Sequence, residues 1–310
     1  MWFLFAIAGG SLQAVRNAVS KGLSARVSAP LNSWARFAFN LPWACACTVL
    51  VSWDEPSPRL SLNFFLACLV AGIAQLLANI ALVSAFRYTT FAESIVLNKL
   101  EVVFTALVGV AFFAEVPSVV GWGGMVMCMV GAVAIHLGHG AASRAGGGSE
   151  RTRLLRLAPG PALSTLAAAL LVVASFAVKY AINALAADNP WAADEALVLP
   201  AHTLLHVTWI EVVILTLTLL MQQRAAFQQV PANVFAMAHV GLFAFASSLC
   251  WYMAFASGLV AYVRAVGQVE VAWSVLIGLW LFRERQAPWR LVGTALVTAG
   301  VLLVLLAAVE

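Results

Sequence analysis

The chain has 310 residues, of which 63% are hydrophobic and only 10% are charged, whereas soluble domains carry about 25% charged residues. This composition excludes an ordinary soluble enzyme and indicates a membrane protein. The net charge of +4 comes from basic residues scattered over short loops, so it predicts no nucleic-acid binding.

Apolar runs long enough to cross a bilayer recur along the whole chain. A helix needs about 20 residues to span a hydrocarbon core of about 30 Å. Ten runs fit: 2–23, 28–52, 62–86, 91–113, 118–138, 160–186, 197–221, 233–256, 260–282 and 288–308. The first run lacks a basic n-region and a small-residue cleavage site, so we interpret it as a span rather than a leader. The sequence thus predicts an all-α polytopic membrane protein with ten transmembrane helices.

The fourth and fifth spans recur as the ninth and tenth. Residues 98–115, NKLEVVFTALVGVAFFAE, reappear 169 residues later as residues 267–284, GQVEVAWSVLIGLWLFRE. The matched pairs are Glu101 with Glu270, Val102 with Val271, Leu107 with Leu276, Gly109 with Gly278, Phe113 with Phe282, Glu115 with Glu284, Gly124 with Gly293 and Gly131 with Gly300. We interpret the pattern as an internal repeat. Each copy places a glutamate in an apolar run, where a charge is costly and indicates function.

A segment rich in glycine, serine and arginine separates the copies. We therefore predict a first repeat over 1–138, a flexible cytoplasmic linker over 139–159 and a second repeat over 160–310. Five spans per repeat is an odd number, so the two repeats should be inverted in the membrane, as in alternating-access transporters. Outside the spans, Arg59 is the single basic residue in the loops after even-numbered spans, whereas the loops after odd-numbered spans carry all the others. This bias predicts that the linker is cytoplasmic and that both termini lie outside.

Polar residues at helical spacing mark the faces that should line a central cavity. They occur on the first four spans of each repeat. The fifth span of each repeat, 118–138 and 288–308, instead shows glycines seven residues apart, which suits close helix packing. These two spans are predicted to lie outside the cavity, as braces or as contacts of a homodimer; the alternative is a monomer.

The duplicated motif with its glycine-rich following helix, together with APLNSWARF and AFRYTTFAES, resembles the EamA-like members of the drug/metabolite transporter superfamily over nearly the whole chain. The resemblance implies ten helices in two inverted five-helix repeats, a cavity between the halves, and efflux or uptake of small metabolites. Many members carry proline after the repeated glutamate. Here Val102 and Val271 stand there, so a proline-induced helix break is not implied.

The charges inside the spans are mixed: Arg16, Arg36, Lys99, Lys179 and Arg264 against Glu93, Glu101, Glu211 and Glu270. Such a lining suits a zwitterion, because a cation can bind its carboxylate and a glutamate its ammonium. Several of these charges could instead pair as buried struts. The candidate substrate-binding or coupling residues are Glu101, Glu270, Arg16, Arg36, Lys99, Lys179, His206, Gln75, Asn79, Asn98, Trp251, Gln268 and Trp273. Either repeated glutamate could carry a coupling proton.

His202 and His206 have a metal-compatible spacing, but no third ligand or HExxH motif accompanies them, so no metal or other cofactor is predicted. We expect a multi-pass secondary transporter of the inner (plasma) membrane that exports small polar metabolites, chiefly amino acids, by proton exchange or facilitated diffusion. The open alternatives are uptake or exchange of organic anions or phosphorylated metabolites, an intramembrane enzyme, and a receptor or scaffold that moves no solute.

Overall fold

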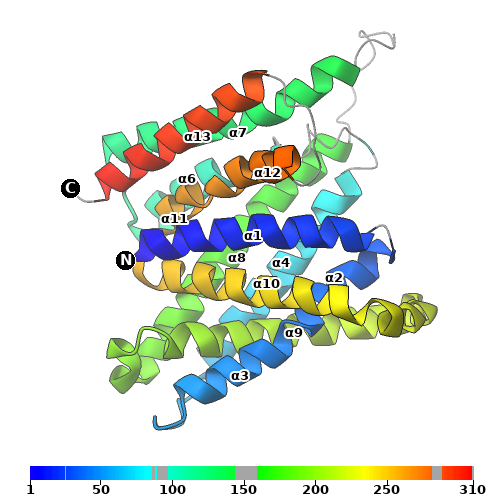
Figure 1. Cartoon of the computed structure of the whole chain (residues 1–310). Helices are drawn as coiled ribbons and strands as arrows, with labels where there is room; N and C mark the ends of the chain where they lie inside the picture. Colours follow the sequence, from blue (N-terminus) through cyan, green and yellow to red (C-terminus); the bar gives the residue numbers. More distant parts are fainter. Residues whose placement is uncertain (25, 86–87, 89–96, 144–158, 281–287, 309–310) are drawn as a thin grey trace. The chain divides into compact units, whose positions relative to one another are not determined.

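The computed structural model describes the chain except residues 25, 86–87, 89–96, 144–158, 281–287 and 309–310. The described residues form helices and no strands. The α-helices are α1 (Trp2–Ser24), α2 (Ala29–Ala38), α3 (Leu41–Val51), α4 (Leu62–Ala85), α6 (Glu101–Phe113), α7 (Val119–Ser143), α8 (Pro159–Asp188), α9 (Val198–Gln222), α10 (Val230–Ser257), α11 (Val260–Val266), α12 (Val269–Trp280) and α13 (Pro288–Ala307). The short 3-10 helices η2 (Pro190–Asp194) and η3 (Arg224–Gln229) flank α9 (Figure 1).

Several of these helices are suited to a bilayer. Within the described residues, five helical stretches are long and apolar enough to cross it: Ala29–Val51, Leu62–Leu82, Gly160–Asp188, Val198–Gln222 and Arg224–Ser257. Glu101–Phe113, Val119–Ala134 and Val292–Ala307 are shorter apolar helices. The prediction of a helical membrane protein agrees with this architecture, and the count of ten spans stays a prediction. The helix α7 continues to Ser143, past the predicted end of its span, and most of the predicted linker lies outside the described residues.

The chain packs as two compact units, which do not follow the two sequence repeats. The first unit comprises Met1–Ile73 and Ser175–Gly258, and the second comprises Ala74–Ala174 and Leu259–Glu310. Each unit therefore combines helices from both halves of the chain.

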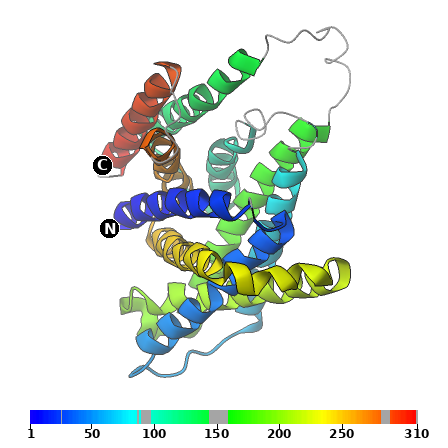
Figure 2. The same cartoon turned by 45° about the vertical axis from the view of Figure 1, so that its right-hand side comes forward.

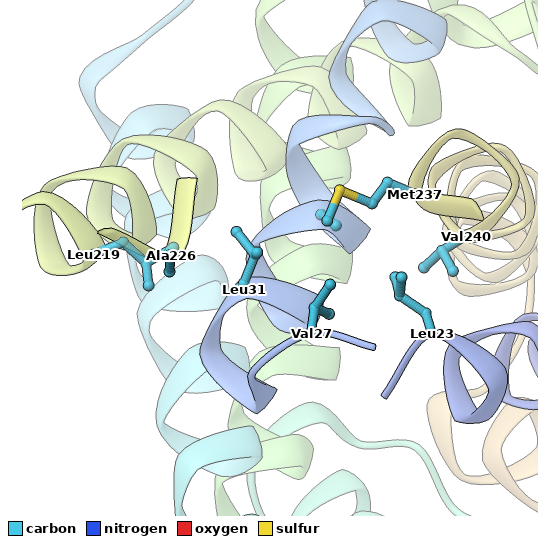
Figure 3. Packing of buried hydrophobic residues seen from close by; sticks show 8 residues of the cluster. Leu23, Val27, Leu31, Leu219, Ala226, Met237 and Val240 are labelled. Carbon is cyan, nitrogen blue, oxygen red and sulfur yellow. The ribbon is translucent and has the colours of Figure 1, made fainter. Parts of the chain in front are cut away.

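In the first unit, α1 and α10 run side by side, as Figures 1 and 2 both show. Their contact is close: Ser247 of α10 donates a hydrogen bond to the Gly9 carbonyl of α1 at 3.0 Å, and Gly9 packs against the Trp251 ring. A buried apolar cluster joins several elements of this unit (Figure 3). Its members are Leu23, Val27, Leu31, Ala35, Leu219, Ala226, Met237 and Val240. They come from the end of α1, from the connection that follows it, from α2, from the end of α9, from η3 and from α10, so burial of apolar surface holds these elements together.

The predicted span 28–52 is one stretch long enough to cross a membrane, but a two-residue turn just before Pro42 divides it into the helices α2 and α3. Proline has no N–H to donate and its ring clashes with the carbonyl four residues earlier, so a helix breaks before it. The glycine at 241 in α10 lies against the break, since a Cβ there would collide with the Phe39 backbone. This close approach places α10 directly beside the α2–α3 junction.

In the second unit, α7 and α13 pack along their glycines (Figure 1). A Cβ on Gly124 would lie 2.8 Å from the Gly300 oxygen, and a Cβ on Gly131 would lie 2.6 Å from the Gly293 oxygen. The early glycine of each helix thus faces the late glycine of the other, so the two helices run antiparallel. The Cys128 thiol lies between these contacts, 3.6 Å from the carbonyl oxygen of Val297, its counterpart at the repeat offset of 169 residues.

The helix α6 ends on Ala114 in the left-handed conformation, with φ 53°. The Cβ of alanine is sterically strained in the left-handed region, whereas glycine has no Cβ and adopts this conformation freely. We expect Ala114→Gly to raise the free energy of unfolding by about 1 kcal/mol. Thermal unfolding in detergent checks this, with Ala106→Gly, inside the same helix and buried, as the control that should destabilise the protein. An unchanged or lower stability of Ala114→Gly would contradict the prediction.

Candidate functional site

A turn lies directly in front of each helix that carries a repeated glutamate. Lys99 and Leu100 form a turn before Glu101 opens α6, and Gly267 and Gln268 form a turn between α11 and α12, two residues before Glu270. In the second copy the backbone changes to bonds spanning three residues: Gln268 N–H donates to Ala265 at 3.1 Å, and Glu270 N–H donates to Gly267 at 3.1 Å. The predicted span 260–282 is therefore two helices, although no proline lies at the break.

The Gln268 side chain compensates for the interruption. Because its backbone N–H has turned to Ala265, its side-chain Nε2 donates to the carbonyl of Arg264 instead, at 3.3 Å. The residue is 3% exposed, and its Oε1 accepts no hydrogen bond from any described residue. Broken helices inside a bilayer need such polar partners, and they occur where transporters bind their substrates.

Glu101 and Arg264 form the charged centre of the second unit. The closest atoms, Glu101 Oε2 and Arg264 Nη1, are 3.9 Å apart, and the side chains are 7% and 15% exposed. That distance is an ion pair but is too long for a hydrogen bond. Glu101 Oε2 is buried and accepts no hydrogen bond from any described residue. The pair thus offers a carboxylate oxygen and a guanidinium that are already adjacent but incompletely satisfied by each other.

Other predicted site residues belong to the same unit. Asn98 and Lys99 are buried just before Glu101, and the Asn98 Oδ1 has no hydrogen-bond donor among the described residues. Gln75 and Asn79 are half-buried on the second part of α4, and Glu270 is half-buried on α12. Trp273 is 42% exposed, which is more than a residue enclosed on all sides would show.

The remaining predicted residues lie in the first unit, and each of them contacts another residue of that unit. Arg16 Nη2 donates to Asn17 Oδ1 at 2.8 Å, and Trp251 Nε1 donates to Gln13 Oε1 at 3.2 Å. Lys179 Nζ donates to the carbonyl of Gly258 at 2.9 Å. Gly258 follows the last residue of α10, and a positive charge is stabilised at the C-terminus of a helix. Arg36 lies over the Phe37 ring, 5.0 Å from its centroid.

The two histidines of α9, His202 and His206, also belong to the first unit. The Nδ1 atom of His206 is 2.7 Å from the His202 carbonyl oxygen, so this nitrogen carries the proton and donates. His202 Nε2 is 2.9 Å from the Ser52 hydroxyl, and the His206 ring packs on Phe64 and Phe65. Over the described part of the chain, no three His, Cys, Asp or Glu side chains are grouped as metal ligands.

Two charged residues of the spans matter more in the structure than in the sequence interpretation. Arg264 is one of the charges inside the predicted spans but is not among the predicted site residues, and it is the partner of Glu101. The same is true of Glu211, whose side chain is 1% exposed. Both stand in apolar runs, and that is the signal by which the sequence could have identified them.

The chain was compared with protein-family models, with curated proteins and with solved structures. The model of the EamA-like transporter family matches residues 1–137. A solved structure described as "Crystal structure of protein" is similar with a TM-score of 0.65, at 15% identity, covering 100% of this chain and 98% of that chain. At this identity the likeness concerns the fold alone. No curated protein sequence matches the chain.

Proposed function

Through residues 1–137 the chain belongs to the EamA-like transporter family of the drug/metabolite transporter superfamily, and on this premise we propose that it exports small polar metabolites, chiefly amino acids and related zwitterions. Members of the family are membrane transporters rather than enzymes. The observation that supports the substrate class is the Glu101–Arg264 pair, whose atoms lie 3.9 Å apart. An ammonium group would supply the donor that Glu101 Oε2 lacks, and a carboxylate would accept from the guanidinium in the bidentate geometry that arginine favours.

Alternating access between two inverted five-helix repeats is the mechanism that we propose. The antiparallel packing of α7 on α13 supports it, because these helices are counterparts at the repeat offset and parallel copies would not bring them together with opposite directions. The turns before Glu101 and Glu270 support a substrate site near the middle of these two predicted spans. We further propose an inner-membrane location with both termini outside, from the distribution of lysine and arginine.

Transport by the purified full-length protein in liposomes tests the function. We expect ¹⁴C-labelled amino acids to undergo counterflow, in which unlabelled amino acid inside the vesicles drives uptake of the label. Glu101→Gln should abolish the counterflow, since the neutral amide cannot balance an ammonium group. Glu195→Gln, the same change at an exposed glutamate before α9, should leave it intact.

The competing readings predict different results. Counterflow of a dicarboxylate or a sugar phosphate without any amino acid would contradict the zwitterion proposal and favour organic anions. A protein that moves none of these solutes, or that turns over a lipid or peptide instead, would contradict the transport function.

A further inference from the structure

The most deeply buried charged group among the described residues is in neither copy of the repeated motif. Glu211 lies in the middle of α9, in the first unit, and is 1% exposed. Its Oε1 accepts no hydrogen bond from any described residue. Burial of an ionised carboxylate with an unsatisfied oxygen is strongly unfavourable, whereas a carboxylic acid is neutral and can donate a hydrogen bond.

The ionisable groups around Glu211 come from three other helices of the same unit. Arg36 of α2 and Tyr252 of α10 both lie close enough to Glu211 to interact electrostatically with its carboxyl group. Tyr252 interacts in the same way with Arg36 and Cys68. Cys68 belongs to α4, whose Gly72 allows close packing: a Cβ there would lie 3.6 Å from the Glu211 Cγ. The cysteines of α3, Cys45 and Cys47, are exposed and half-buried. Arg36 and Tyr252 are thus the charged group and the hydroxyl group that neighbouring helices of the first unit bring near the Glu211 carboxyl.

This cluster is not duplicated. The helices α2 and α9 begin at Ala29 and Val198, which are 169 residues apart, the same separation as between Glu101 and Glu270. At that offset the counterpart of Glu211 is Pro42, and the counterpart of Arg36 is Leu205. The repeated glutamates therefore come in two copies, whereas Glu211 with Arg36 and Tyr252 comes in one.

Resting on the transport function proposed above, we propose that Glu211 is the proton-binding site that couples transport to the pH gradient, with Arg36 and Tyr252 as the groups that position and release its proton. The carboxylate takes up one proton at Oε1 and releases it to water once per transport cycle. Glu101 and Arg264 are then left to the substrate, which separates the two tasks between the two units.

The test uses the full-length protein in liposomes and a mixture of ¹⁴C-labelled amino acids as probe. Counterflow at equal pH needs no net proton movement, whereas accumulation against a gradient does. We expect Glu211→Gln to keep counterflow and to lose accumulation driven by a pH gradient, down to the level of protein-free liposomes. Glu195→Gln should keep both activities, and Glu211→Asp, which restores a carboxyl group, should recover the gradient dependence.

Infrared difference spectroscopy supplies a readout that does not depend on transport. The spectrum of the wild type minus that of Glu211→Gln should show the C=O stretch of a protonated carboxylic acid at neutral pH. If this band is present but no amino acid moves, the proposed substrate is wrong and the proton site stands. Counterflow together with an unchanged pH-gradient response in Glu211→Gln would overturn the inference, as would absence of the band. Should Glu211→Gln fail to fold, Glu211→Asp takes its place, and a band that does not shift in that variant overturns the inference equally.

Discussion

Replacing Arg264 with glutamine is expected to cost about 3–5 kcal/mol of unfolding free energy and to abolish transport, because it leaves Glu101 as a buried carboxylate without its partner cation. Both side chains are largely removed from solvent, so water cannot take over the role of the guanidinium. Glu101→Gln should cost less, because the side chain that it leaves without its charged partner, Arg264, is the more exposed of the two. Unfolding monitored in detergent micelles measures the stability, and proteoliposome counterflow measures the transport.

The double variant Arg264→Gln/Glu101→Gln distinguishes an ion pair from mere packing. If the charges interact, removing both leaves neither one unpaired, so the double variant should be more stable than Arg264→Gln alone. Additive losses in the two single variants would show that the 3.9 Å contact carries no coupling energy. Transport should stay abolished in the double variant, because both groups that we assign to the zwitterion are then neutral.

Gly131→Ala is expected to lower the free energy of unfolding by about 1–3 kcal/mol, the usual cost of overpacking. Its Cβ would lie 2.6 Å from the Gly293 oxygen and 2.6 Å from the Val297 nitrogen. Both are backbone atoms, which cannot move aside without separating α7 from α13. The loss should appear as a lower midpoint of thermal unfolding in detergent.

Gly123→Ala is the matched control in the same helix. A Cβ at that position meets no atom within 4 Å, so the substitution adds a methyl group without any clash. Alanine is the better helix former by about 1 kcal/mol, so Gly123→Ala should be neutral or stabilising. Equal losses in Gly123→Ala and Gly131→Ala would contradict the role of glycine in the α7–α13 contact.

The seven-residue spacing of these glycines was visible in the sequence, and it correctly indicated helices that pack closely. What the sequence left open was the partner, either another molecule or another part of the chain. In the structure the two glycine faces pack against each other within the second unit. A row of small residues predicts that a helix packs closely against another, but it does not identify the partner, because any helix with a similar surface could fit against it.

Of the two helix breaks, one could be predicted from the sequence and the other could not. The break between α2 and α3 follows from Pro42 and was predictable, since a proline inside a helical run removes a hydrogen bond locally. The break between α11 and α12 has no such residue. It is stabilised by Gln268, whose side chain reaches back to the Arg264 carbonyl, and glutamine forms helices well enough that its presence predicts nothing.

The sequence by itself determined that the chain is helical and built for a membrane, that the motif around Glu101 recurs around Glu270, and which charges stand in apolar runs. Those properties depend on hydropathy and residue type along the chain, which are local. Only the tertiary structure decided that Glu101 lies beside Arg264 and that Glu211 lies among Arg36, Tyr252 and Cys68. Such partners come from different helices, and which side chains meet there depends on helix breaks, crossing and rotation, which the pattern along any single helix does not contain.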